Sequence, residues 1–183
     1  MKWYLGIDIS KGYADFVLLS DQLIQVDQTF QLDDTRQGHE HLASWLATLY
    51  KRHPDLHVDC AVESTGGFED NWYALLLKLS STLSIRVARL NPSVVKNASK
   101  AMLNANKTDA ESAREIASYL KRFEDQVDYR VRSDHYTSFR SLHNHLELVK
   151  KQKTQVINEL KQLLYSSLPE LQRCCKQGIP NLV

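Results

Sequence analysis

Hydrophobic residues along the first ninety positions alternate between a spacing typical of strands and a spacing typical of helices. Short apolar runs bounded by turn residues predict strands, and apolar residues at offsets of three and four predict helices. The expected strands are residues 3–9, 14–19, 23–30, 58–62 and 84–90, and the expected helices are residues 35–54, 68–79, 93–103 and 108–123. This order, βββαβαβ with trailing helices, predicts an α/β domain in which crossover helices join parallel strands.

The βββαβαβ order matches the RNase H-like fold, a mixed sheet with flanking helices, and the domain is expected to span residues 1–123. In that arrangement the first strand lies in the middle of the sheet, beside the fourth. Asp8 near the end of the first strand and Glu63 just past the fourth would then be neighbours in space. The element order therefore directs attention to these two carboxylates.

The second part of the chain is a long helical pattern. Residues 124–132 are polar and predict a hinge, and residues 133–168 carry apolar side chains every three or four positions. Such a repeat predicts a long helix in coiled-coil packing, although Lys153 in the apolar seam weakens the prediction of a strong dimer. Pro169 ends the helix, and we expect residues 169–183 to be the start of a missing C-terminal domain.

Charge is distributed unevenly, although the net formal charge is only +1. Residues 1–129 carry 14 basic and 18 acidic side chains, whereas residues 130–183 carry 9 and 4. An acidic body with a basic arm is compatible with nucleic acid, because the arm can neutralise phosphates while carboxylates hold metal. A solvated helix face is the simpler explanation of the same charge.

The sequence gives no sign of export or membrane insertion. No run approaches the roughly 18 apolar residues of a membrane span. The start of the chain lacks the basic region, the apolar region and the cleavage site of a secretory signal. We therefore expect a cytoplasmic protein without a membrane partner.

Three carboxylates occupy positions suited to a two-metal site for phosphodiester cleavage, which needs several carboxylates around paired Mg²⁺ ions. Asp8 follows an apolar strand, at the end where α/β sheets place their sites. Glu63 lies between a buried strand and a glycine turn, where desolvation is unfavourable without a partner or a metal. Asp109 lies in the first turn of a helix. Simpler alternatives exist, since Asp8 could cap a turn and Asp109 favours the helix dipole.

Several residues near these carboxylates are candidates for contact with nucleic acid. Lys107 precedes a helix N-terminus, where a cation is unfavourable unless it faces an anion such as phosphate. Backbone amides of the turn that contains Thr65 and Gly66 could approach a phosphate. The remaining candidates are lysines of the domain and of the helical arm, namely Lys96, Lys100, Lys150 and Lys151. Solvated surface charge explains these lysines about equally well.

Four segments of the sequence together resemble a known family, and the set in this order is more specific than any single segment. They are GIDISK, VESTGGFEDNWYALLLKL, VARLNPSVVKNASKA and NKTDAESAREIA. Together they resemble the DEDD-type insertion-sequence transposases, the family that includes Piv-like DNA invertases and bridge-RNA-guided recombinases. The resemblance covers residues 3–122, and the helical region that follows resembles the coiled-coil insert of the same family.

The resemblance implies a RuvC-like domain that uses Mg²⁺, with Mn²⁺ as a substitute, to cut and exchange DNA strands. Its acidic tetrad maps onto Asp8, Glu63 and Asp109, which would be the metal ligands, and onto a fourth catalytic position. Here that position is Ser112, whereas the family pattern has an aspartate.

The serine at position 112 removes one charge from the tetrad that the resemblance implies. A hydroxyl coordinates Mg²⁺ weakly, so we expect a loosely bound second metal unless Glu111 or Glu115 compensates. Members of the family also carry a C-terminal domain whose serine is thought to attack the scissile phosphate, and nothing after Leu171 resembles it. The chain by itself is therefore expected to lack complete recombination activity. The implied partners are DNA, a guide RNA in one branch of the family, and further copies in a dimer or tetramer through the coiled coil.

Three other interpretations stay open. A stand-alone Holliday-junction resolvase of the RuvC type would share the fold and the acidic residues. A nucleic-acid-binding assembly module would have a decayed active site, marked by Ser112. A sugar-kinase-like protein is suggested by GIDIS, but such folds need two large domains and this chain has 183 residues.

Overall fold

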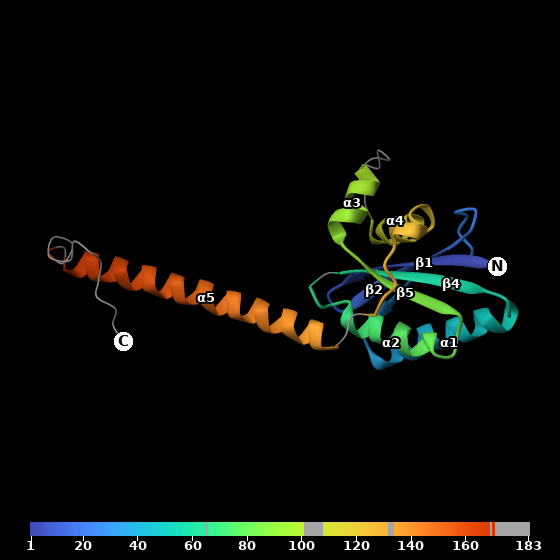
Figure 1. Ribbon diagram of the computed structural model, residues 1–183, viewed down its shortest axis with the longest axis horizontal. Coiled ribbons are helices and arrows are strands. Elements are labelled where there is room, and N and C mark those ends of the chain that lie inside the picture. Colours follow the sequence, from blue (N-terminus) through green and yellow to red (C-terminus); the bar gives the residue numbers. More distant parts are fainter. Residues whose placement is uncertain (65, 101–107, 132–133, 169, 171–183) are drawn as a thin grey trace. The chain divides into compact units, whose positions relative to one another are not determined.

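The computed structural model of this chain describes residues 1–64, 66–100, 108–131, 134–168 and 170 (Figure 1). It forms two compact units, Met1–Arg130 and Val131–Val183. The first unit contains β1 (Lys2–Ser10), β2 (Tyr13–Ser20), β3 (Phe30–Asp33), α1 (Arg36–Arg52), β4 (His57–Glu63), α2 (Asp70–Ser80), β5 (Ile85–Leu90), α3 (Pro92–Lys100), α4 (Asp109–Arg122) and the 3-10 helix η1 (Glu124–Gln126). The second contains α5 (Asp134–Ser167).

The five strands of the first unit form one mixed sheet in the order β3-β2-β1-β4-β5. The first three strands pair antiparallel, whereas β4 runs parallel to β1 and β5 runs parallel to β4. The predicted βββαβαβ order and the mixed sheet of the RNase H-like fold are thereby confirmed. β1 lies in the middle of the sheet, so the end of this strand has neighbours on both sides.

The third strand does not lie where the apolar pattern placed it. Residues 23–30 were expected to be extended, but β3 begins only at Phe30. Leu23 has a positive φ of 61° and its N–H donates to Ser20 O at 2.9 Å, which closes a turn. Ile24 is 62% exposed and Gln25 forms only an isolated bridge with Leu19, so the segment after the turn is not a regular strand. β3 is instead held by Phe30, whose ring stacks on Phe16 of β2.

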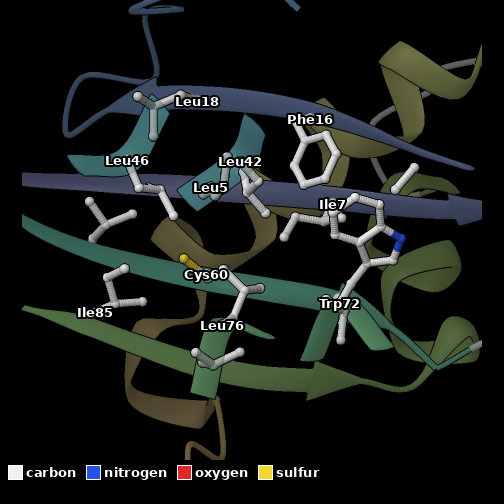
Figure 2. Packing of buried hydrophobic residues seen from close by; sticks show 14 of the residues in the cluster. Leu5, Ile7, Phe16, Leu18, Leu42, Leu46, Cys60, Trp72, Leu76 and Ile85 are labelled. Atoms are coloured by element: carbon white, nitrogen blue, oxygen red, sulfur yellow. The ribbon is translucent and has the colours of Figure 1, made fainter. Parts of the chain in front are cut away.

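Helices cover both faces of the sheet, because alternate residues of each strand point to opposite sides. One core lies between the sheet and the helices α1 and α2 (Figure 2). Its larger buried side chains include Leu5, Ile7, Phe16, Leu18, Leu42, Leu46, Trp72 and Leu76. The second core lies on the opposite face, where Tyr4, Ala61 and Ala88 pack against Ile116 and Leu120 of α4.

The backbone of α4 lies directly against β1 at Gly6. A Cβ atom on Gly6 would lie 2.0 Å from the carbonyl oxygen of Ala113 and 2.5 Å from the backbone nitrogen of Ala117. Only glycine permits this approach. Two residues earlier on the same face, Tyr4 donates a hydrogen bond to Glu124, which follows the end of α4. The helix therefore runs antiparallel to β1, and its first turn lies toward the end of the strand that carries Asp8.

The second unit is dominated by α5, which has 34 residues. Its apolar side chains recur with a heptad spacing and are exposed, namely Phe139, Leu142, Leu146, Val149, Val156, Leu160 and Leu163. The predicted long helix is present, and its coiled-coil pairing stays a prediction. Within the described part of the chain, no helix has the length and apolar character that crossing a membrane requires.

Candidate active site

Strand register places Asp8 and Glu63 at the same edge of the sheet. The parallel ladder between β1 and β4 matches Ile7 with Val62, and Asp8 and Glu63 are the next residues of their strands. Asp8 shares the face of Gly6, and Glu63 shares the face of Ala61, so both belong to the side covered by α4. Each is half-buried. Neighbouring strands lie about 4.8 Å apart, so the two carboxylates are neighbours.

The start of α4 provides the other two positions expected for the site. Asp109 is the first residue of the helix, and its side chain lies outside the described residues. Ser112 is half-buried and directly precedes Ala113, the residue whose carbonyl faces Gly6. The helix begins regularly, since the Ser112 N–H donates to Thr108 O at 2.9 Å. The start of α4 thus brings positions 109 and 112 toward the end of β1 that carries Asp8.

Glu111, one of the two residues expected to compensate for Ser112, takes part in a capping box. Its backbone N–H donates to the hydroxyl oxygen of Thr108 at 3.3 Å. Its carboxylate accepts a hydrogen bond from the Thr108 N–H at 2.9 Å. This reciprocal pair fixes the first turn of α4. Glu111 is exposed and its carboxylate is held at the helix end, so its compensation for Ser112 stays a prediction.

A further carboxylate, Asp15, lies beside Asp8 and was missed by the sequence analysis. The antiparallel ladders match Asp8 with Asp15, and Asp15 with Gln31. Asp15 is only 7% exposed. The Gln31 amide nitrogen donates to its two carboxylate oxygens at 3.1 and 3.3 Å. The one signal for Asp15 in the sequence is an acidic residue inside an otherwise apolar strand.

The turn after Glu63 is organised by another residue that sequence reasoning missed, the buried Glu69. This side chain is 2% exposed and accepts hydrogen bonds at 2.9 Å from the Ser64 hydroxyl and from the Gly67 N–H. Gly66 and Gly67 have φ values of 81° and 114°, which explains the need for glycine here. Thr65, expected to contact phosphate, lies outside the described residues. Glu69 therefore fixes the shape of the loop that follows Glu63.

Arg89 joins this loop to β5 and α2. Its guanidinium lies 3.5 Å from the Glu69 carboxylate and 2.8 Å from that of Asp70. The same group stacks 4.1 Å above the ring centroid of Tyr73. Arg89 is thus part of the support of the loop.

The predicted nucleic-acid contacts are distributed over both units. Lys96 is exposed on α3, whereas Lys107 and the side chain of Lys100 lie outside the described residues. Lys150 and Lys151 are exposed on α5, where Lys150 pairs with Glu147 at 2.8 Å. Lys96, Lys150 and Lys151 are accessible, and the role of all five lysines stays a prediction.

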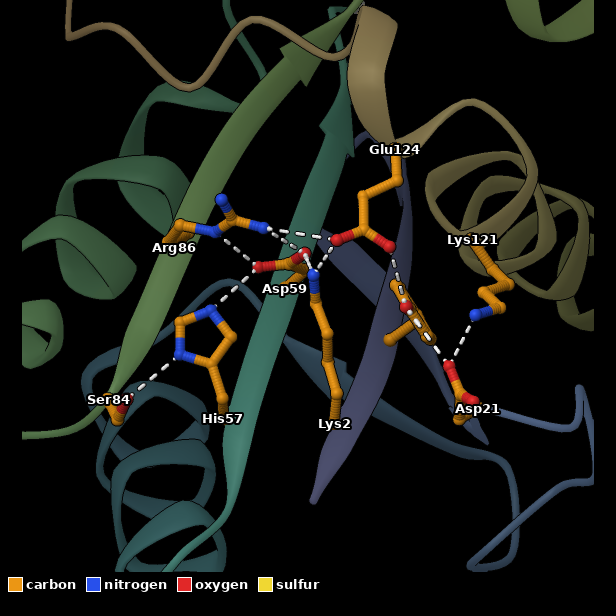
Figure 3. A network of polar contacts seen from close by, with 9 residues as sticks. Lys2, Asp21, His57, Asp59, Ser84, Arg86, Lys121 and Glu124 are labelled. Atoms are coloured by element: carbon orange, nitrogen blue, oxygen red, sulfur yellow. Dashed lines mark hydrogen bonds and ion pairs between the residues drawn. The ribbon is translucent and has the colours of Figure 1, made fainter.

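The opposite edge of the sheet holds a buried ionic cluster around Asp59 (Figure 3). Asp59 is fully buried and accepts two hydrogen bonds from Arg86, at 2.7 and 2.6 Å. Lys2 lies 3.0 Å from the same carboxylate, and His57 also lies 3.0 Å from it. Burial acts to raise the pKa of Asp59, but the hydrogen bonds from Arg86 and Lys2 outweigh it and hold that pKa below its ordinary value.

The Asp59 cluster also fixes the segment that leaves α4. Glu124 accepts hydrogen bonds from Lys2 and from the Tyr4 hydroxyl, and the Arg86 guanidinium lies 4.3 Å above the ring centroid of Tyr129. Glu124 and Tyr129, which lie in the range predicted to be a hinge, thus pack within the first unit. Because the cluster lies at the amino ends of β1, β4 and β5, it is separate from Asp8 and Glu63 and supports structure.

The donor set at the Asp8 edge fits a hard divalent cation. Carboxylate oxygens are the ligands that Mg²⁺ takes from proteins, and they also suit Mn²⁺. Among the side chains that the structure describes, no three histidine, cysteine, aspartate or glutamate residues form a metal-binding group. The third expected ligand, Asp109, is not among those side chains. The described residues therefore supply two neighbouring carboxylates that could hold a cation, Asp8 and Glu63, and the backbone position of the third expected ligand, Asp109.

Comparison with known proteins gives a family. No curated protein matches the chain. The structure of Thermus thermophilus RuvC in complex with a Holliday junction substrate is similar at 13% identity and a TM-score of 0.49, covering 70% of this chain and 99% of that one. The fowlpox virus Holliday junction resolvase is similar at 11% identity and a TM-score of 0.42, covering 66% and 98%. A family model described as a transposase, DEDD_Tnp_IS110, matches residues 5–169. The chain therefore belongs to the DEDD IS110 transposase family.

Proposed function

We propose that this chain is the metal-dependent catalytic part of a DNA transposase that cuts and exchanges strands. Asp8, Glu63 and Asp109 would hold Mg²⁺ or Mn²⁺, and Ser112 would occupy the fourth catalytic position. The observation that carries the proposal is the strand register that makes Asp8 and Glu63 neighbours at one edge of the sheet, in a member of a transposase family.

The residues around this edge would act by holding the carboxylates in place. A bound divalent ion would polarise the phosphate and stabilise the charge that develops on its oxygens. Asp8 and Glu63 are fixed by neighbouring strands, and Glu69 fixes the loop directly after Glu63. The close contact at Gly6 sets the position of α4, and with it the backbone of Asp109. Such rigidity favours catalysis because the ligands need no rearrangement when charge develops.

The second unit would supply assembly and additional contacts with nucleic acid. The exposed heptad side chains of α5 suit pairing with another copy in a dimer or tetramer. Lys150 and Lys151 on that helix, with Lys96, Lys100, Lys107 and the turn at Thr65 and Gly66, would contact DNA phosphates. We also propose that a guide RNA can be a partner and that the protein acts in the cytoplasm. Complete recombination is expected to require, in addition, a C-terminal domain that carries a serine.

The proposal predicts that the chain binds Mn²⁺ through Asp8 and Glu63. Calorimetric titration of the wild-type chain should show binding, and Asp8→Asn or Glu63→Gln should weaken it by roughly tenfold or more, since loss of even an outer-shell partner costs about 10- to 100-fold. Asp125→Asn, which removes an equal charge from an exposed position on η1, is the matched control and should leave the affinity unchanged.

Equal affinity of the wild type and both variants would contradict the metal site. No Mn²⁺ binding by the wild type, together with salt-dependent DNA binding that a chelator does not change, would favour a decayed binding module. Ser112 is the observation that points to this second function.

A further inference from the structure

We infer that Asp15 is a supporting carboxylate of the same site, whose negative charge strengthens cation binding at Asp8. It would supply the charge that Ser112 does not. This inference rests on the proposed metal site and adds a residue to it on a different strand. Asp15 would act through Asp8, so it is a positioning residue and not a metal ligand.

The strand ladders give Asp15 its place. Asp8 and Asp15 are direct partners of the antiparallel ladder between β1 and β2, so their side chains leave the same face of the sheet. Directly opposite residues have Cβ atoms about 4.5–5.5 Å apart. Glu63 continues the same row on the other side of Asp8. Three carboxylates on three adjacent strands therefore share the face covered by α4.

Burial makes the charge of Asp15 effective. The residue is 7% exposed, and charge interactions are screened less in such a position than at the surface. Its partner Gln31 donates from one amide nitrogen to both carboxylate oxygens, at 3.1 and 3.3 Å. An amide carries no formal charge, so Gln31 orients Asp15 by hydrogen bonding alone. A cation bound by Asp8 would be attracted by this fixed negative charge.

The same contacts indicate an indirect role. Gln31 lies on β3 and holds both oxygens of Asp15, so the carboxylate is anchored from the side of β2 opposite to Asp8 and Glu63. An outer-shell carboxylate that tunes a first ligand is a common part of metal sites. A test of this role must therefore change the charge at Asp15 while keeping its contact with position 31.

Two substitutions change this charge in different ways. Asp15→Asn removes it with little change of shape. Gln31→Lys alters an exposed residue of β3, keeps a donor to Asp15, and places a cation beside it. The matched controls are Asp125→Asn and Gln126→Lys, which make the same charge changes at exposed positions of η1.

Calorimetric titration of the chain with Mn²⁺ should show that Asp15→Asn and Gln31→Lys each weaken binding by about 10- to 100-fold, whereas both controls bind as the wild type does. Gln31→Lys separates charge from structure, because it keeps the anchoring contact of Asp15 and should not lower the melting temperature without metal. A purely structural role of Asp15 predicts no loss of affinity in Gln31→Lys.

The inference would be overturned if both variants bound Mn²⁺ like their controls while Asp8→Asn lost binding. That result would leave the proposed metal site intact. A wild-type chain that binds no Mn²⁺ would overturn the metal site and the inference together.

Discussion

Asp59→Asn is expected to lower the free energy of unfolding of the first unit by about 2–3 kcal/mol, because it removes the shared anion of a buried ionic cluster. Breaking a buried pair commonly costs about 3–5 kcal/mol. The cost should be smaller here, since the Arg86 and Lys2 side chains are 42% and 26% exposed and solvent can hydrate the remaining charges.

Urea unfolding followed by tryptophan fluorescence measures this effect, since Trp3, Trp45 and Trp72 all lie in the first unit. Asp125→Asn removes a charge from an exposed residue and serves as the control. The pKa of Asp59 is lowered in the folded state, so its contribution is present at neutral pH and is lost as pH falls below about 4. The difference between wild type and variant should therefore shrink in acid. Equal stability at pH 7 would show that the cluster does not stabilise the fold.

Gly6→Ala is expected to cost about 3 kcal/mol or more, at the upper end of overpacking effects. The added methyl group would meet two backbone atoms of α4, the Ala113 carbonyl oxygen at 2.0 Å and the Ala117 nitrogen at 2.5 Å. Backbone atoms cannot turn aside as a flexible side chain can, so the whole helix must shift. That shift would also move the start of α4, and the proposed metal site should lose affinity.

The same urea titration tests this prediction, with Gly12→Asn as the control. Gly12 has a φ of 93° and open space where a Cβ would stand, and asparagine tolerates positive φ better than most residues. The control should change stability by less than about 1 kcal/mol, within the range of surface substitutions and mild strain. A Gly6→Ala protein as stable as the control would mean that α4 can move away from β1 at little cost.

The order of strands and helices along the chain could be predicted from the sequence, because apolar residues are spaced differently in strands and in helices. The apolar run after Ser20 was wrongly predicted to be a strand, since a strand and a turn that bears exposed apolar residues look alike over four or five positions. What separates them is the left-handed backbone at Leu23 and the stacking of Phe30 on Phe16. Both depend on the pairing of β2 with its neighbours, which the residues after Ser20 do not reveal by themselves.

The candidate site could be predicted only in part for a similar reason. Asp8 and Glu63 follow apolar strands, so their position relative to a strand end is visible along the chain. Three buried carboxylates lie within or beside apolar segments, namely Asp15, Glu69 and Asp59. Their roles depend on hydrogen-bond partners from other parts of the chain, which the local sequence does not show. Strands buried on both faces are nearly continuous apolar runs, so their pattern alone does not set the register that decides which carboxylate lies beside Asp8.

The central claim is that Asp8 and Glu63 hold a divalent metal at the carboxyl edge of the sheet. An anomalous difference map from crystals of the chain grown with Mn²⁺ tests it most directly. The account predicts a peak about 2.1 Å from carboxylate oxygens of both residues, a distance typical of a small hard cation. A Mn²⁺ peak bound elsewhere, with none at Asp8 and Glu63, would contradict it.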